Sequence, residues 1–149
     1  MLNSVTDSSA DDAANQITAA EYGEHCLIIY PDLATLRLFY SVFTKRQIEA
    51  NGTILIALFY ETANQVRQIL SDKNSWEVSK YENQDILTIM DSMESYFGKE
   101  RTMYSINEYV THAQAIGKKG FSAVADVGVF ILKNRIDELV QIELTLPIK

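Results

Sequence analysis

The stretch HCLIIYPD, residues 25–32, decides how the fold is interpreted. Its first part, 25–30, forms a continuous apolar run, which is typical of a strand buried on both faces. Asp32 is a good helix N-cap, and large apolar side chains recur at helical spacing after it. An α/β nucleotide-binding protein has its glycine-rich phosphate loop at such a junction. No glycine lies between Gly23 and Gly52, so the sequence predicts this frame without the part that binds phosphate.

Further apolar runs and helical patterns alternate along the chain. Strands are predicted at 25–30, 53–60, 76–81, 86–90 and 120–126. Helices are predicted at 33–49, 61–70 and 103–116 and from about residue 135, with a loop at 96–98 and a short helix around 11–20. This order predicts an α/β fold in which a mainly parallel sheet has helices on both faces, in three α/β/α layers.

The formal net charge of −7 at pH 7 is spread unevenly along the 149 residues. Residues 1–24 hold five acidic side chains and no Lys or Arg, so the rest of the chain carries only −2. This first segment is also rich in small and polar residues, which favours flexibility. We therefore expect a flexible acidic leader at 1–23 and, given the length, a single domain at 24–149.

The composition argues against several kinds of partner and site. Nucleic-acid binding needs clustered Lys and Arg, and the basic pairs at 45–46 and 118–119 fall near predicted helix ends. No apolar stretch approaches the roughly 20 residues that span a bilayer, and no signal peptide is recognisable. A single cysteine, Cys26, fits a reducing compartment, so we expect a cytoplasmic protein without membrane or direct nucleic-acid contacts. The two histidines and Cys26 form no zinc-binding pattern, and we expect no metal and no cofactor.

The ends of the predicted strands supply the candidate binding residues, because ligands of open parallel sheets bind beyond the carboxyl ends of the strands. We call this edge of the sheet the rim. Its candidate side chains, with one more from the loop at 96–98, are Tyr30, Asp32, Tyr60, Glu61, Asp91, Tyr96 and Asp126. The rim is therefore aromatic and acidic. It would repel a phosphate unless a metal ion intervened, because it has no P-loop lysine and no glycine-rich nest.

Several of these residues also have a simpler structural interpretation. Asp91 and Asp126 could hold Mg²⁺, but helix capping or hydrogen bonding within the protein is the more frequent role of such acids. Tyr96 could cover a pocket as part of an aromatic lid, or it could pack in the core or at an interface. His25 is expected to be a structural histidine, and Cys26 a small buried hydrophobe.

Three segments carry a family resemblance through their order and spacing. The first is HCLIIY at 25–30, followed after a helix and Gly52 by the apolar run TILIAL. The second is ILTIMDSMESYFGK, and the third runs from Gly120 to Leu146 and includes Asp126 and Glu143. Together they resemble the MEDS domain, the sensory domain named after methanogen proteins and the regulator DcmR. The resemblance, which covers about residues 25–146, implies a fold related to RecA- and KaiC-like ATPases without the Walker A sequence. It also implies a sensory role, often beside a DNA-binding or kinase module.

These observations favour a non-enzymatic sensory or regulatory domain that binds a small ligand or a protein partner, in signal transduction or transcription regulation. A kinase or a transcription regulator would be the expected protein partner. Two alternatives stay open. One is a degenerate RecA-like nucleotide-binding protein that uses Asp91 and Asp126 around Mg²⁺. The other is a purely structural interaction module whose apolar segment at 139–148 pairs with another chain, including a second copy of this one.

Overall fold

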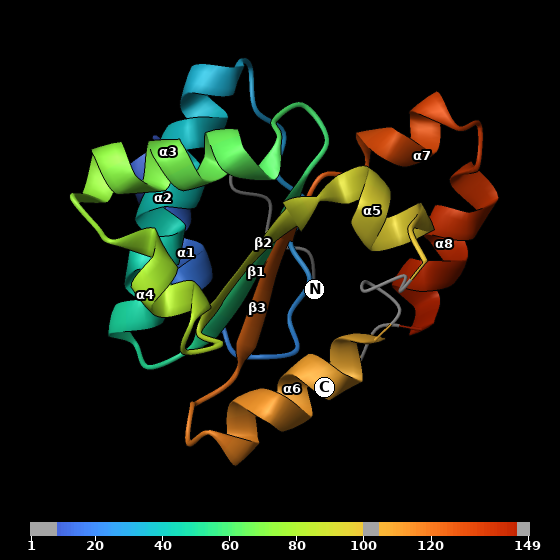
Figure 1. The fold of residues 1–149 in the computed structure, drawn as a ribbon. Helices are drawn as coiled ribbons and strands as arrows, with labels where there is room; N and C mark the ends of the chain where they lie inside the picture. The colour runs from blue at the N-terminus through green and yellow to red at the C-terminus, as the bar shows by residue number, and fades with distance from the viewer. Residues whose placement is uncertain (1–8, 100–104, 146–149) are drawn as a thin grey trace.

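The computed structural model describes residues 9–99 and 105–145 of the chain. These residues form an α/β fold, in which helices lie on both sides of one parallel sheet (Figure 1). The strands are β1 (Thr53–Leu58), β2 (Leu87–Asp91) and β3 (Phe121–Ala125). The helices are α1 (Ala10–Thr18), α2 (Leu33–Glu49), α3 (Ala63–Asn74), α4 (Val78–Glu82), α5 (Ser92–Phe97), α6 (Ile106–Ala115), α7 (Gly128–Leu132) and α8 (Ile136–Thr145). The expected α/β class and parallel sheet are confirmed.

Strand β1 forms the centre of the sheet, with β2 on one side and β3 on the other. Its residue Ile56 is paired with Ile89 of β2 and with Val124 of β3. All six residues of β1 are buried, because neighbouring strands cover both edges and helices cover both faces. The continuous apolar run TILIAL is the sequence pattern that this position requires.

The first core fills the space between the sheet and helices α1 to α4. The side chains of Ile54, Ile56 and Leu58 alternate along β1 and point to this side. Helix α2 contributes several of the large side chains that meet them, and its Phe39 and Phe43 rings stack with centroids 5.6 Å apart. This core holds α2 and α3 against the sheet.

The second core lies on the opposite face of the sheet. Leu55 and Ala57 of β1 point to this side, where α5, α7 and α8 contribute buried side chains. The Phe130 ring of α7 is fully buried, and its centroid lies 4.6 Å from that of Tyr96 and 5.1 Å from that of Phe97, both in α5. These ring contacts fix α5 and α7, which begin where β2 and β3 end.

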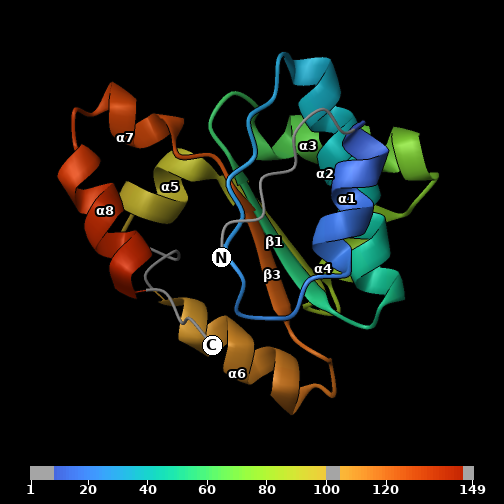
Figure 2. The same cartoon turned by 180° about the vertical axis from the view of Figure 1, so that it is seen from behind.

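The predicted strand at 25–30 is absent, so this prediction was wrong. The segment is irregular and runs beside β3, at the free edge of the sheet (Figure 2). Leu27 and Ile29 are 74% and 89% exposed, whereas Ile28 and Tyr30 pack against the first core. A strand buried on both faces needs a covering layer on each. Within the described residues, this segment is covered only on the side of the first core.

Other local predictions also differ from the structure. The pattern at 76–81 predicted a strand but belongs to the region of α4, because Val78 and Tyr81 are one helical turn apart and both pack on the first core. The predicted loop at 96–98 is largely the end of α5, and α7 was not predicted. Cys26, expected to be buried, is exposed.

Residues 9–23, which we expected to belong to a flexible leader, include the short helix predicted there. This helix is α1, which begins at the N-cap Ser9 and buries Ala14 completely against the first core. Residues 1–8 lie outside the described residues, as do the predicted start of a helix at 103 and the end of the apolar segment at 139–148. Within 9–99 and 105–145, no helix is long and apolar enough to cross a membrane.

Candidate functional site

The carboxyl ends of the three strands meet at one edge, as the rim hypothesis requires. Leu58 of β1 is paired with Asp91 of β2, and Ala57 is paired with Ala125 of β3. The residues that follow β1 and β3, among them Glu61 and Asp126, therefore lie near one another although they are far apart in sequence. The rim is built by the sheet and not by a single loop.

Asp126 is the residue on which the rim is centred. Its amide donates to the Ala57 carbonyl at 2.9 Å, which extends the pairing of β3 with β1. Its carboxylate accepts two hydrogen bonds, from the Gly128 amide at 2.9 Å and from the Tyr30 hydroxyl at 3.1 Å. The Ser92 hydroxyl donates to its carbonyl at 2.9 Å. Asp126 thus connects the edge of the sheet with α5, α7 and the chain before α2.

Glu61 forms the second part of the rim and is only 3% exposed. Arg37 Nε donates to one carboxylate oxygen at 2.6 Å, and the Tyr40 hydroxyl donates to the other at 3.0 Å. Both donors come from α2, one helical turn apart. A buried carboxylate needs such partners, because desolvation without hydrogen bonds is costly. Glu61 therefore holds the loop after β1 against α2.

The carboxylates of Asp126 and Glu61 both interact electrostatically with tyrosines. Burial, followed by the Asp126 carboxylate and its hydrogen bond and then by Tyr60 and Glu61, raises the pKa of Tyr30 to about 12. Burial and the Glu61 carboxylate likewise raise the pKa of Tyr40. Both phenols stay protonated near neutral pH and act as hydrogen-bond donors to the carboxylates.

Tyr60 is an exposed member of the rim residues. It is 57% exposed, and its ring contacts Phe59 edge-on with centroids 4.9 Å apart. A Cβ atom placed on Gly128 would come within 3.5 Å of the Tyr60 hydroxyl and 3.1 Å of the Asp126 carboxylate. The Tyr60 hydroxyl therefore lies close to the Asp126 side of the rim. The structure brings together four of the seven predicted residues: Tyr30, Tyr60, Glu61 and Asp126.

Asp32 and Asp91 both accept hydrogen bonds from backbone amides at helix starts, Asp32 at the start of α2 and Asp91 at the start of α3. The Asp32 carboxylate accepts from the amide and from the hydroxyl of Thr35, both at 2.8 Å, and the amide hydrogen bond is the main reason that the pKa of Asp32 is lowered. The Asp91 carboxylate accepts from the Ala63 amide at 3.0 Å, at the start of α3. Both geometries fit helix capping, the simpler interpretation that the sequence left open for Asp91.

Tyr96 is placed away from the open side of the rim. It is 2% exposed and packs its ring against Phe130 in the second core. Of the two interpretations that its sequence position allowed, core packing fits the structure and a lid does not. A side chain with this burial stabilises α5 against α7.

Sequence reasoning missed Arg37 and Tyr40. Both lie within α2, where the helical pattern of the sequence does not indicate that they bind a carboxylate. Their partner Glu61 lies 24 and 21 positions further along the chain, and helical periodicity does not reveal contacts of this kind. Only the buried position of a carboxylate directly after an apolar strand could have indicated that it needs donors.

Metal ligation finds little support in the part of the chain that the structure describes. There, no group of three or more His, Cys, Asp or Glu residues is arranged to hold an ion. The Asp91 and Asp126 carboxylates each accept a hydrogen bond from a backbone amide, which is the structural role of these acids that the sequence also allowed.

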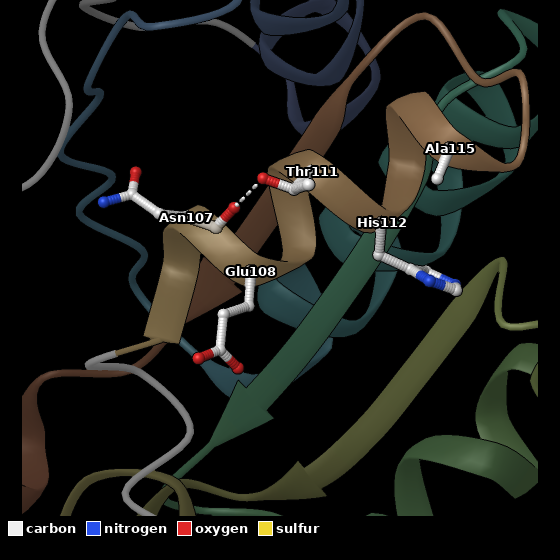
Figure 3. Close-up of a pocket in the computed structure, with 5 residues that line it drawn as sticks. All are labelled: Asn107, Glu108, Thr111, His112 and Ala115. Atoms are coloured by element: carbon white, nitrogen blue, oxygen red, sulfur yellow. Dashed lines mark hydrogen bonds between the residues drawn. The ribbon is translucent and has the colours of Figure 1, made fainter.

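A surface hollow of about 390 Å³ lies elsewhere, on α6 (Figure 3). It is lined by Asn107, Glu108, Thr111, His112 and Ala115, all from one helix. Of these side chains, His112 lies with its Nε2 3.8 Å from an Asp85 carboxylate oxygen. We place the candidate site at the rim and not in this hollow, because side chains from several distant segments converge at the rim.

Comparison of the chain with protein-family models, with curated proteins and with solved structures found no match. The resemblance to the MEDS domain therefore stays an expectation from the sequence. What the rim does has to be argued from its own geometry.

Proposed function

We propose that the protein is a non-enzymatic sensory or regulatory domain that binds a small ligand at the rim. The observation that carries this proposal is the hydrogen bond from Tyr30 to Asp126, which joins the chain before α2 to the end of β3. It assembles Tyr30, Tyr60, Glu61 and Asp126 where ligands of parallel α/β sheets bind.

The chemistry of the rim favours a positively charged or hydrogen-bond-donating ligand. Carboxylates accept hydrogen bonds and attract cations, and the exposed Tyr60 offers an aromatic face to an organic cation. Within the described residues, a phosphate finds no comparable partner in this group, since Arg37 already donates to Glu61. A small ammonium compound is the ligand class that fits best.

Binding is favoured over catalysis by the state of the ionisable groups. Both Glu61 oxygens and both Asp126 oxygens accept hydrogen bonds within the protein. The raised pKa of Tyr30 keeps its proton in place near neutral pH. These hydrogen bonds hold the carboxylates in a fixed geometry, and a tyrosine that keeps its proton near neutral pH is a poor general base.

The finer parts of the sequence interpretation belong to this proposal. They are a three-layer RecA- or KaiC-like arrangement, membership of the MEDS family, and a kinase or transcription regulator as the downstream partner. The parallel sheet with helices on both sides supports a fold of this kind. The three-stranded sheet is smaller than the sheet expected from the sequence.

Calorimetric titration with tetramethylammonium and with a series of primary amines tests the proposal. We expect saturable binding that Asp126→Asn weakens at least about tenfold, because it removes the charge that attracts the cation. Asp72→Asn, an exposed position on α3, is the matched control and should leave binding unchanged. Absence of binding by all these compounds would refute the ammonium-ligand proposal. Binding of ATP with Mg²⁺ would favour the nucleotide alternative instead.

A second candidate function, protein interaction, is favoured by one specific surface. Ile136, Val140 and Leu144 follow one another at helical spacing on α8 and are 45%, 49% and 72% exposed. An apolar stripe of this kind is unusual on a surface that meets only water. Sedimentation at increasing concentration tests the homo-oligomer form. Association that Val140→Glu abolishes would support it, and a protein that stays monomeric throughout would exclude it.

A further inference from the structure

The segment at residues 25–30, which we call the edge segment, is held alongside β3 at both ends. Before it, the Tyr22 ring lies over Gly120, so closely that a Cβ atom there would be 2.7 Å from the ring. At its end, the Tyr30 hydroxyl donates to Asp126, directly after β3. Since Gly120 precedes β3 and Asp126 follows it, these two contacts give the edge segment the same direction as β3, beside which it lies (Figure 2).

Among the described residues, the outward backbone groups of β3 have no backbone hydrogen-bond partner in this segment. The Gly120 carbonyl accepts from the Thr53 amide, and the Asp126 amide donates to the Ala57 carbonyl. The backbone groups of the even-numbered residues between them therefore face β1. In a parallel ladder, the N–H and C=O groups of alternate residues point to opposite sides. The groups of Phe121, Ala123 and Ala125 therefore face the edge segment. Among the described residues, no backbone hydrogen bond joins the two.

The side chains of the edge segment already alternate as those of a strand would. Ile28 and Tyr30 pack on the first core, and Leu27 and Ile29 are exposed on the other side. The chain beside β3 is, however, longer than an extended strand would need to be. Eight steps lead from Tyr22 to Tyr30, whereas β3 needs six from Gly120 to Asp126. The edge segment has the composition and direction of a strand but is not fully extended.

We propose that the edge segment pairs with β3 as a fourth parallel strand in a second state of the protein. The hydrogen bond from Tyr30 to Asp126 sets the register, which places Ile28 beside Val124 and Leu27 beside Ala123. Ile28 and Val124 already pack on the same core. Pairing gives the outward backbone groups of β3 hydrogen-bond partners, and exposed strand edges are a general liability.

This pairing connects the rim to α8. His25, at the start of the edge segment, lies 3.6 Å from Glu143 of α8, and α8 carries the exposed apolar stripe. A ligand that contacts Tyr30 or Asp126 changes the hydrogen bond that positions the end of the edge segment. The pairing transmits this change to α8. The structural step itself needs no ligand, so it can be tested independently of the proposed function.

A disulfide trap tests the pairing in the full chain. In a Cys26→Ser background, Leu27→Cys with Ala123→Cys places two thiols side by side on one face of the paired strands. The control pair, Ile28→Cys with Ala123→Cys, places them on opposite faces. We expect the first pair to form a disulfide at least about tenfold faster than the control, because disulfides require close and correctly directed Cβ atoms. Equal rates in the two pairs would overturn the proposal.

Hydrogen exchange gives a second, independent measurement on the unmodified chain. Paired strands protect the outward amides of Ala123 and Ala125, and Tyr30→Phe should accelerate their exchange about tenfold while the amides of β1 stay unchanged. Equal exchange in both proteins would contradict the role of Tyr30 in setting the register. Protection that increases with protein concentration would mean that a second copy occupies this edge, and would overturn the intramolecular pairing.

Discussion

At the scale of single residues, the energetically sensitive positions are buried polar groups. Glu61 is stabilised by Arg37 and Tyr40, which satisfy both carboxylate oxygens. The hydroxyls of Ser41 and Thr44 on the same helix are also buried, but among the described residues they have no hydrogen-bond partner. A satisfied and an unsatisfied polar group should respond to removal in opposite directions.

Tyr40→Phe should destabilise the protein by about 2 kcal/mol, because it leaves one oxygen of the buried Glu61 carboxylate without a donor. Urea unfolding followed by circular dichroism measures this change. Tyr60→Phe is the matched control, since Tyr60 is exposed, and we expect it to cost about 0.5 kcal/mol or less. Equal losses in both variants would mean that Tyr40 contributes no more than a surface tyrosine.

Thr44→Val should stabilise the protein by about 1 kcal/mol, because it replaces a fully buried hydroxyl, which has no partner among the described residues, by a methyl group of similar shape. Thr44→Ser provides the contrast: it keeps the unpaired hydroxyl and removes the methyl group, so it should destabilise. The same unfolding measurements compare the two variants. A destabilised Thr44→Val protein would show that the hydroxyl has a partner, such as water.

At the scale of elements, the sequence predicts best where the pattern and the burial agree. β1 was predicted because TILIAL is a continuous apolar run, and the structure buries it on both faces. α2 was predicted because Asp32 caps a regular helical pattern. The edge segment has an equally apolar sequence but remains irregular, because a pattern gives the preference of a segment and not the layers available to cover it. The order of the elements along the chain locates the strand ends, so the rim could be predicted. It does not reveal contacts between a helix and a distant loop, so Arg37 was missed.

Helix α1 belongs to the folded body, although its composition predicted a flexible segment. Ala14→Glu should destabilise the protein by about 2 kcal/mol, because it buries a charge at a position that is fully covered. Gln16→Glu adds the same charge on the exposed face of α1 and should change the stability by about 0.5 kcal/mol or less. Urea unfolding again measures both. If Ala14→Glu were also neutral, α1 would not contribute to the stability of the core.

At the scale of the whole molecule, two cores share one small sheet, and polar groups join them at its carboxyl edge. The first core holds α1 to α4, and the second core holds α5, α7 and α8. Asp126 accepts from Tyr30 on one side and from Gly128 on the other. Asp126 therefore links the elements on the two sides of the sheet through its carboxylate.

The contribution of the Tyr30 hydroxyl should disappear at alkaline pH. Its pKa is raised from 10.0 to about 12 in the folded protein, mainly by burial and then by the Asp126 carboxylate. The unfolded chain therefore releases this proton first, so the stabilisation is fully present below pH 10 and is lost as the pH rises to about 12. The difference in stability between the natural protein and Tyr30→Phe should accordingly shrink across this window. Comparing the two proteins by urea unfolding at each pH cancels the titration of groups that they share. A difference that stayed constant through the window would mean that Asp126 does not hold the Tyr30 proton in the folded state.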